Sequence, residues 1–370
     1  MRVLVVNAGS SSLKVRLLDA DDAVLRQLDL PPPRRGEDNA GLIDALTDVG
    51  PVDAAGHRIV HGGQRFRDPV LVDDGVVAEL HALTDLAPLH QPGSLAALEL
   101  VGQALPGVPN VACFDTAFHA TLPPAATTYA LPAAWRERWP LRRYGFHGLS
   151  HAYAARRAGE VLQRTRTQLR VVTCHLGAGA SLTAVLDGRS VDTTMGFTPL
   201  EGLVMATRSG SVDPGLLLWL TQRKGVSTAE LGEGLEHASG LTGLAGTPDM
   251  RNVLARAEAG DEQARLALDV YLHRLRAGIG AMTAALAGID ALVFTGGVGE
   301  RAPAVRAAAV EGLNYLGIRL DPERNLTAEG DADLSAPDAH ARVLLIHARE
   351  DLEIARQVRA ALEAEATVPL

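Results

Sequence analysis

The sequence predicts a mixed α/β protein with two similarly built domains, a prediction that rests on chain length and on two matching segments. The chain has 370 residues, about the length of two domains. Segment 171–182 repeats the plan of segment 3–13, in which strand residues, a polar residue and a glycine turn lead through Ser-Leu into a second strand. The match predicts an internal duplication in which each domain begins with a hairpin facing a shared cleft. Two unrelated strand-turn-strand units are the alternative.

The elements of the first half follow from local patterns. An apolar run over 3–6, a polar turn over 7–12 and a second apolar run over 13–18 predict a hairpin. We expect Ser94 to cap a helix over 95–105 and Ser150 to cap a helix that runs through 164.

Patterns in the second half of the sequence predict strands that alternate with helices. Apolar residues at helical spacing predict one long helix over 263–286. A strand over 291–295 is followed by a helix that Pro303 opens. A last strand over 343–346 precedes a terminal helix over 351–364.

Composition excludes several functional classes. Lys and Arg total 35 against 44 Asp and Glu, and aromatics make up 4%, so the basic patch and stacking rings of a nucleic-acid partner are not expected. No apolar run approaches the roughly 18 residues of a membrane span, so no membrane partner is expected. The first residues show no charged region followed by a signal-type apolar stretch, so a secretory segment is not expected. Cys113 and Cys174 cannot form a disulfide framework, which predicts a cytoplasmic protein.

A glycine run after a predicted strand is a candidate phosphate-binding turn. The run 297–302 has the pattern Gly-x-Gly-x-x-Ala, and Asp321 lies at about the distance of a ribose contact. The run lies near the end of the chain and follows another glycine, so we favour a mononucleotide contact over a dinucleotide fold or a plain turn. No P-loop string is present.

Two histidine pairs have the spacing of zinc ligands, but glycines interrupt both predicted helices. The pairs are His57 with His61 and His147 with His151, and no third ligand stands nearby. A phosphate contact is the favoured role for His147, and a structural role is favoured for His57.

Two arginines in apolar or glycine-rich segments indicate anion binding. Arg58 and Arg208 each need an anionic partner, because an unpaired buried cation is costly. That partner is either an internal carboxylate or a ligand carboxylate or phosphate. Asp115, which follows an apolar run, is a candidate to pair with one of these arginines or to act in catalysis.

Several strings together resemble a known family. They occur in family order over 7–14, 57–63, 87–90, 114–119, 143–148, 192–203, 207–210, 249–251 and 294–300. On these strings the sequence resembles acetate kinases, whose superfamily also contains sugar kinases and actin. The resemblance implies two actin-like (ribonuclease H-like) α/β domains flanking an interdomain cleft.

The resemblance also implies an activity and its cofactors. The expected reaction is reversible transfer of a phosphoryl group from ATP to acetate, giving ADP and acetyl phosphate by direct in-line attack, with Mg²⁺ or Mn²⁺. It implies an acyl-substrate and metal domain over 1–148, with the terminal helix 348–370 packing back on it, and a nucleotide-binding domain over 149–347. A homodimer is expected, largely through the second domain. The predicted helix 263–286 is one candidate for its interface, although its apolar face could equally be internal core.

Roles are carried over residue by residue. The resemblance implies that Asn7 and Glu350 hold the metal, that Arg58 and Arg208 bind acetate and the transferring phosphoryl group, that His147 stabilises the phosphoryl oxygens, and that Asp115 is the essential acid. The acyl pocket is expected from Val60, Leu89, Phe146 and Pro199. Nucleotide contacts are expected from Lys14, His175, Leu176, Gly177, Ala178, Gly179, Asp249, Met250, Arg251, Gly297, Val298, Gly299, Glu300 and Arg301.

The chemistry fits this set of residues. Acetate is already ionised at neutral pH, so its attack needs no general base. The reaction instead needs charge cancellation, because an anion must approach a polyanion. We therefore expect Asp115 to orient an arginine or a metal-bound water rather than to accept a proton.

The sequence departs from the family pattern at several positions. Ala178 and Arg301 stand where asparagines are usual, and 91–94 differs from the common pattern beside the pocket. Because 91–94 lies beside the expected acyl pocket, a kinase for propionate or another short acid is the nearest alternative. A non-catalytic actin-like nucleotide sensor is a third possibility.

Overall fold

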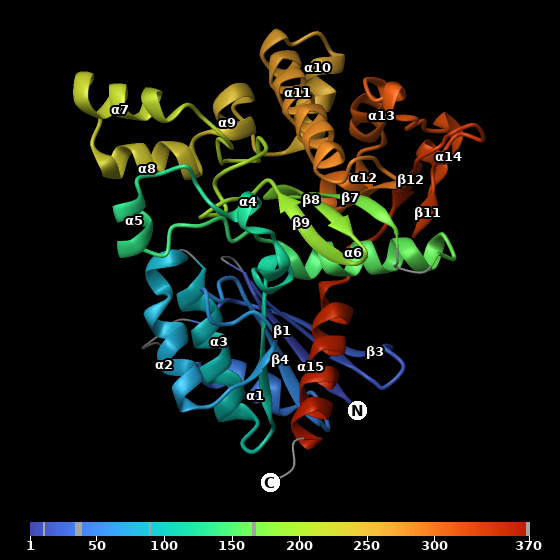
Figure 1. Cartoon of the computed structure of the whole chain (residues 1–370). Coiled ribbons are helices and arrows are strands. Elements are labelled where there is room, and N and C mark those ends of the chain that lie inside the picture. The colour runs from blue at the N-terminus through green and yellow to red at the C-terminus, as the bar shows by residue number, and fades with distance from the viewer. Residues whose placement is uncertain (10–11, 34–38, 89, 165–167, 368–370) are drawn as a thin grey trace. The chain divides into compact units, whose positions relative to one another are not determined.

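The chain divides into two compact units, each with its own sheet (Figure 1). The computed structural model describes residues 1–9, 12–33, 39–88, 90–164 and 168–367. The first unit comprises Met1–Ala120, Phe146–Tyr153 and Arg349–Leu370, and the second comprises Thr121–Gly145 and Ala154–Ala348.

A mixed sheet forms the centre of the first unit. Within the described residues it has six strands in the order β3-β2-β1-β4-β6-β5. Strands β1, β4 and β6 are parallel, and the other three pair antiparallel with their neighbours. The strands are β1 (Val3–Ala8), β2 (Leu13–Leu18), β3 (Val24–Leu30), β4 (Ala54–Ile59), β5 (Val70–Leu71) and β6 (Asn110–Phe114).

Helices cover both faces of this sheet. One face carries α1 (Ala40–Thr47), α2 (Asp74–Ala82), the 3₁₀ turn η1 (Thr84–Leu86) and α3 (Gln91–Ala104), and η2 (Ala117–Thr121) follows β6. The other face carries the terminal helix α15 (Glu350–Ala366), which contacts β1, β4 and β6. Gly56 permits this contact, because a Cβ there would lie 2.6 Å from the side chains of Ile354 and Val358.

The second unit repeats the same strand order. Among the residues described there, six strands pair as β9-β8-β7-β10-β12-β11, and β7, β10 and β12 are parallel. The strands are β7 (Arg170–Leu176), β8 (Ala180–Leu186), β9 (Arg189–Thr193), β10 (Ala291–Thr295), β11 (Ala332–Asp333) and β12 (Arg342–Leu345). The shared order and directions agree with the internal duplication expected from the two matching segments.

The helices of the second unit come before the first of these strands or between them along the chain. They are α4 (Pro124–Thr127), α5 (Ala133–Arg138), α6 (Gly148–Val161, which begins in the first unit), α7 (Pro214–Arg223), α8 (Thr228–His237), α9 (Gly240–Ala245), α10 (Met250–Glu258), α11 (Glu262–Ala285), α12 (Gly296–Arg301), α13 (Pro303–Glu311), η3 (Asn314–Leu316) and α14 (Pro322–Thr327). The long helix α11 packs on β8, and a face that includes Leu272, Leu275 and Ile279 is buried inside the unit.

Most sequence-predicted elements are confirmed, but two helix starts are wrong. Helix α3 begins at Gln91, before Ser94, because Pro92 suits the first turn, where no intrahelical N–H bond is needed. Helix α6 likewise begins at Gly148 rather than after Ser150, since the His151 N–H already bonds to the His147 carbonyl. It ends at Val161 and not at 164.

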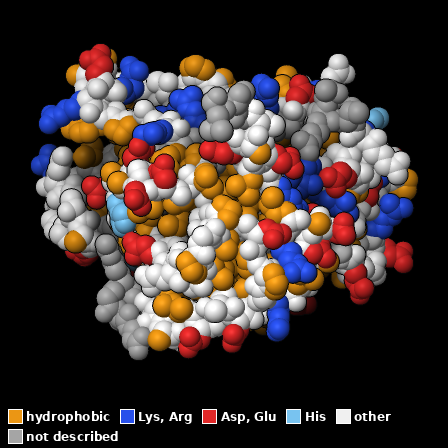
Figure 2. Space-filling view, turned by 90° about the horizontal axis from the view of Figure 1, so that it is seen from below, with side chains coloured by type: hydrophobic (Ala, Val, Ile, Leu, Met, Phe, Trp, Pro, Cys, Tyr) orange, Lys and Arg blue, Asp and Glu red, His pale blue; other side chains and the backbone are white. Residues whose placement is uncertain are grey.

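One face of the molecule carries mixed charge. In Figure 2, Lys and Arg side chains are interspersed with Asp and Glu around a central group of hydrophobic side chains. That face therefore differs from the continuous basic stripe of nucleic-acid-binding surfaces. No helix in the described ranges combines the length and the apolar composition needed to cross a membrane.

Candidate active site

Charged and amide side chains gather at the carboxyl edge of the first sheet. Asn7 lies near the end of β1, Arg58 near the end of β4, and Asp115 directly after β6. Because these three strands are parallel and adjacent, their carboxyl ends meet at one edge, the usual position of ligand sites in α/β sheets. Glu350 begins α15 and joins the same group.

Arg58 and Asp115 form the most extensive ion pair of this cluster. The Arg58 Nη2–Asp115 Oδ2 distance is 2.7 Å, and Nε lies 3.2 and 3.1 Å from the two carboxylate oxygens. The Asp115 side chain is 2% exposed and that of Arg58 is 21% exposed. The partner of Arg58 is therefore an internal carboxylate, one of the two options that the sequence left open.

The remaining Arg58 nitrogen points to Asn7 and Glu350. Nη1 donates to Asn7 Oδ1 at 3.3 Å and lies 3.5 Å from Glu350 Oε2. The Asn7 amide donates to the same glutamate oxygen at 3.4 Å. Lys14 is the cross-strand partner of Asn7, so its ammonium group shares this face of the hairpin.

Burial and charge act in opposite directions within this cluster. Burial raises the pKa of the Asp115 carboxyl, while the charge and hydrogen bonds of Arg58 lower it. For Arg58, burial lowers the pKa of the guanidinium, but the charges of Asp115 and Glu350 outweigh burial and raise it. Arg58 thus stays cationic across the working pH range.

His147 is brought to Asp115 by a close backbone approach. The Gly148 N–H donates to the Asp115 carbonyl at 2.9 Å, and a Cβ on Gly148 would lie 2.1 Å from that oxygen. Only glycine fits there, and the preceding His147 adopts a φ of 56° at the start of α6. The structure therefore brings two predicted catalytic residues together.

Part of the predicted acyl pocket belongs to the first unit. Val60 is 8% exposed and Phe146 is 1% exposed. The ring of Phe146 contacts that of His61, the residue after Val60, at 5.6 Å between centroids. Leu89 lies outside the described residues, and Pro199 belongs to the second unit.

Arg208 differs from Arg58 in its partners. Its Nη1 donates to the Pro199 carbonyl at 3.1 Å and lies 3.8 Å from the Met205 sulfur. Burial lowers the pKa of this guanidinium, and the charge of Glu236 opposes the effect. Of the carboxylates in the described residues, none forms an ion pair with Arg208, so an anionic ligand would supply its missing countercharge.

Two predicted nucleotide-binding segments meet at the carboxyl edge of the second sheet. His175 ends β7 opposite Thr295 of β10, and the turn 177–179 closes with a Gly177 N–H to Gly179 carbonyl bond of 2.9 Å. Gly296, with a φ of 78°, lies so close to Leu176 that a Cβ would stand 3.0 Å from its backbone. Ala178, Gly297 and Arg301 are exposed and accessible to a ligand.

Internal bonds hold the glycine-rich helix α12. Glu300 Oε1 accepts from the backbone N–H groups of Gly296 and Ala348, at 3.1 and 2.9 Å. The buried Arg306 donates to the Gly299 and Glu300 carbonyls, each at 2.8 Å. The carboxylate of Glu300 therefore orders the turn itself, a use that the sequence did not indicate.

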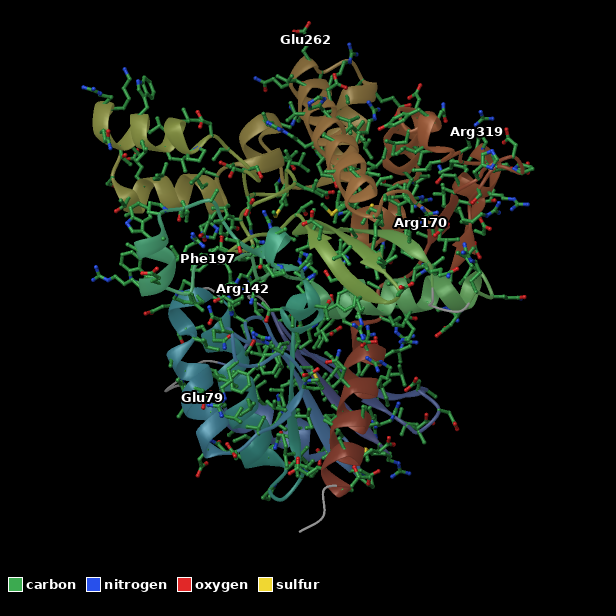
Figure 3. All side chains as sticks on the ribbon, in the orientation of Figure 1. Glu79, Arg142, Arg170, Phe197, Glu262 and Arg319 are labelled. Atoms are coloured by element: carbon green, nitrogen blue, oxygen red, sulfur yellow. The ribbon has the colours of Figure 1, made fainter. Side chains whose placement is uncertain are left out.

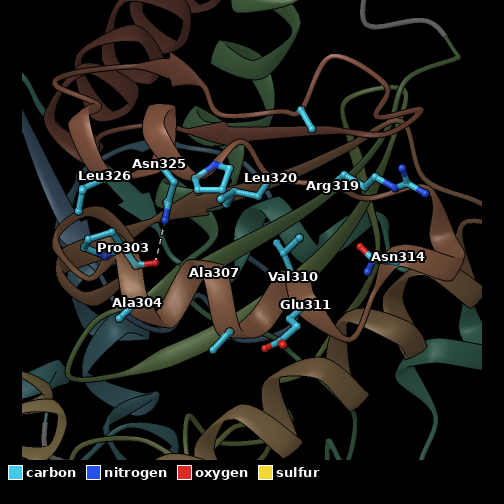
Figure 4. Close-up of a pocket in the computed structure, with 13 residues that line it drawn as sticks. Pro303, Ala304, Ala307, Val310, Glu311, Asn314, Arg319, Leu320, Asn325 and Leu326 are labelled. Atoms are coloured by element: carbon cyan, nitrogen blue, oxygen red, sulfur yellow. Dashed lines mark hydrogen bonds between the residues drawn. The ribbon is translucent and has the colours of Figure 1, made fainter. Parts of the chain in front are cut away.

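A groove of about 920 Å³ lies beside α13 and α14. Figure 4 shows its mainly apolar lining and the Asn325 amide donating to the Pro303 carbonyl. None of the sequence-predicted site residues is among those that line it.

The third predicted nucleotide segment begins α10. Asp249 caps this helix by accepting the Arg251 N–H, and it also forms an ion pair with the Arg251 guanidinium. The Arg251 side chain is 87% exposed, whereas Met250 is buried.

The donor set at the first sheet edge fits a small hard cation. The Asn7 side chain lies beside the Glu350 carboxylate, and Asn7 Oδ1 and Glu350 Oε2 both face Arg58 Nη1, so a bound Mg²⁺ would replace that guanidinium contact. Mg²⁺ is commonly held by one or two carboxylates together with substrate phosphates. No cluster of three or more His, Cys, Asp or Glu suited to a metal occurs in the described part of the chain.

His57 is buried and bonded to an internal partner. It is 1% exposed, and its Nε2 bonds to Asn110 Oδ1 at 2.8 Å. Burial lowers its pKa to about 4. The favoured structural role for His57 agrees with this placement.

Sequence reasoning gave no role to Tyr129, Arg143 or Glu201. These three residues hold the loop that carries Pro199. Arg143 and Glu201 both lie within the strings that carry the family resemblance, which is the one signal that pointed toward them.

Comparisons with known proteins agree over nearly the whole chain. A family model described as the acetokinase family matches residues 40–356. The acetate kinase of Leifsonia xyli is 48% identical over 394 residues, covering 98% of this chain and 99% of the relative. That of Gloeobacter violaceus is 44% identical over 402 residues, covering 96% and 98%.

Solved structures show the same fold. The acetate kinase of Porphyromonas gingivalis superposes with a TM-score of 0.90 at 34% identity, covering 98% of this chain and 99% of that one. A propionate kinase from Francisella tularensis gives 0.89 at 34% identity, covering 97% and 99%. The expected actin-like fold class is confirmed.

The buried His57 predicts a specific loss of stability in acid. The unfolded chain binds a proton near pH 6.5 and the folded chain near 4, so the free energy of unfolding falls as pH falls between these values. Between pH 7 and pH 5 this histidine should contribute a loss of about 2 kcal/mol. In His57→Gln the new side chain keeps a donor for Asn110. Urea titrations should show that its free energy of unfolding falls less between pH 7 and pH 5 than that of the wild type. Equal losses would show that His57 does not titrate as described.

Proposed function

The chain belongs to the acetokinase family, and we propose that it phosphorylates acetate with ATP to form acetyl phosphate and ADP. It is an ATP:acetate phosphotransferase with a two-domain actin-like fold. The observation that carries the proposal is the contrast between its two key arginines. Arg58 has an internal carboxylate partner, whereas Arg208 lacks one among the described residues and so suits an incoming anion.

Positioning and charge cancellation account for the chemistry. The acetate carboxylate attacks the γ-phosphorus in line, and the bond between that phosphorus and the β,γ-bridging oxygen breaks as ADP leaves. Arg58 and Arg208 offset the repulsion between carboxylate and phosphate, while His147 donates to the phosphoryl oxygens. Asp115 acts through Arg58 as a positioning residue, because its carboxylate is occupied by that guanidinium.

The first unit would bind the acyl substrate and the metal. Asn7 and Glu350 would hold Mg²⁺ or Mn²⁺, which when bound neutralises phosphate charge. Lys14 would bind phosphate from the neighbouring strand, and Val60 and Phe146 would contact the methyl group, together with Leu89 and Pro199.

The second unit would bind the nucleotide. The turn 175–179, the segment 249–251 and the exposed residues of 297–301 would contribute the contacts. Cys113 and Cys174 are free and buried, in keeping with a reducing cytoplasm.

The substrate assignment is tested by product formation with a series of acids. Incubation with MgATP, acetate and hydroxylamine should give acetyl hydroxamate, and kcat/KM should fall from acetate to propionate to butyrate as the acyl chain outgrows the pocket. The likeness to a propionate kinase makes propionate the second candidate. A higher kcat/KM for propionate would select it, since one methylene is worth only about 1–3 kcal/mol. No acyl phosphate from any acid would favour a nucleotide sensor instead.

Replacing Arg208 by alanine should remove catalysis and leave the fold intact. The loss of one charge-stabilising donor predicts a fall in kcat of roughly 10²–10³-fold. Arg319→Ala, which removes a half-exposed arginine outside the proposed site, is the matched control and should retain wild-type kcat (Figure 3). Wild-type turnover in Arg208→Ala would reject the assigned role.

A homodimer through the second unit accounts for an exposed apolar helix. In α7, Leu216 is 45% exposed and Trp219 is 48% exposed, and none of its residues is buried. Two such side chains at i and i+3 lie on one face, which a second copy of the chain could cover.

Trp219→Glu should therefore convert a dimer into a monomer in sedimentation velocity. Leu326→Glu, at a 73% exposed position on α14, should leave the dimer unchanged. A dimeric Trp219→Glu protein would place the interface elsewhere.

A further inference from the structure

The loop that carries Pro199 is closed by the carboxylate of Glu201, which lies against Gly196 near the start of the same loop. This loop, 194–203, follows β9, and Glu201 lies so close to Gly196 that a Cβ on the glycine would be within 2.8 Å of the Glu201 carboxyl carbon. A side chain at 196 would therefore displace the Glu201 carboxylate and the Tyr129 hydroxyl from their present positions.

Each oxygen of the Glu201 carboxylate has its own donor. Arg143 Nη2 donates to Oε1 at 2.9 Å, and the Tyr129 hydroxyl donates to Oε2 at 2.6 Å. Both donors come from the segment that precedes α6, at sequence separations of 58 and 72 residues. Hydrogen bonds to a charged acceptor are stronger than neutral ones, so this closure is stiff.

The same two donors also hold the loop backbone. Arg143 Nη1 donates to the carbonyls of Thr194 and Met195, at 3.2 and 3.0 Å. The Tyr129 hydroxyl accepts from the Phe197 N–H at 2.9 Å (Phe197 is labelled in Figure 3). The Arg143 guanidinium lies 5.6 Å from the Tyr129 ring centroid, which joins the two donors to each other.

Two residues after Phe197, the loop meets Arg208. The Pro199 carbonyl accepts from Arg208 Nη1 at 3.1 Å, and this is the shortest polar contact that the structure gives to the guanidinium. Arg208 is therefore oriented by a carbonyl whose own position depends on Phe197 on one side and Glu201 on the other.

We propose that Tyr129, Arg143 and Glu201 form a clasp that positions Pro199 and Arg208, and so sets acyl-substrate affinity and selectivity. This inference rests on the proposed function, in which Pro199 contacts the acyl group and Arg208 binds the anion. The three clasp residues are positioning residues. They lie within one unit and touch the loop, and they act on the reaction through Pro199 and Arg208.

The clasp predicts a kinetic effect confined to the acyl substrate. In Tyr129→Phe, Glu201 loses one donor and the Phe197 N–H loses its acceptor, so Pro199 shifts. We expect kcat/KM for acetate to fall roughly five- to tenfold, because small misplacements of positioning groups are costly. KM for ATP should stay unchanged, and the acetate-to-propionate ratio of kcat/KM should fall as the pocket loosens. Glu201→Gln, which keeps the size of the side chain, should change the same quantities in the same direction.

Tyr144→Phe is the matched control. Its hydroxyl donates to the Pro140 carbonyl at 3.1 Å, whereas its backbone N–H, which donates to the Gly196 carbonyl of the loop, and its ring, 5.9 Å from that of Phe197, are retained in the variant. It should keep wild-type selectivity. If Tyr129→Phe and Glu201→Gln also keep it while the wild type forms acetyl phosphate, the clasp proposal is overturned. If the wild type forms no acyl phosphate, the proposed function itself has failed. A purely structural role would lower thermal stability without changing the acyl selectivity.

Discussion

The ion pair between Arg58 and Asp115 is the interaction on which the candidate site of the first unit depends. A nearly buried carboxylate would be costly without a countercharge, and a guanidinium at the sheet edge would be free to rotate without an anchor. The two-point contact satisfies both requirements and fixes the guanidinium plane. Nη1 is then directed toward Asn7 and Glu350, where the proposed metal and phosphate chemistry takes place.

The repeated topology explains why both units offer ligand-binding edges. In each sheet a hairpin contributes the first parallel strand, and two further parallel strands follow at its side. The turn after the hairpin's first strand and the residues after the next parallel strand therefore meet at the carboxyl edge. The first unit places charged side chains there, which the proposed function assigns to acetate and a metal. The second places the 175–179 turn and α12 there, which the proposed function assigns to the nucleotide.

Local sequence patterns predicted the elements better than the contacts between them. Both hairpins, the long helix α11 and the strand before the glycine run were expected from periodicity and turn residues, which act over a few positions. Helices α3 and α6 began earlier than expected, because Pro92 suits the first turn of α3 and because the His151 N–H already bonds to the His147 carbonyl in α6. The internal match predicted that two similarly built domains each begin with a hairpin, whereas the order of the remaining strands came from the structure.

The sequence predicted which residues belong to the candidate site, but it did not predict which of them pair with one another. Arg58 clearly required an anion, yet Asp115 lies 57 residues away, and only folding shows that this carboxylate and not a ligand is its partner. The sequence indicated an anionic partner for Arg208 as well, but among the described residues no carboxylate forms an ion pair with it. The clasp was missed for a similar reason, because Tyr129 has no local pattern that separates it from an ordinary half-buried tyrosine. Its role depends on a loop more than sixty residues further along the chain.

The most direct test of the central claim is a comparison of kcat/KM for acetate among Arg58→Ala, Asp115→Asn and the double variant. If Asp115 serves to hold Arg58, each single change lowers kcat/KM, and adding Asp115→Asn to Arg58→Ala produces no further loss. Losses that multiply in the double variant would contradict this account, because Asp115 would then act on substrate or metal independently of the guanidinium beside it.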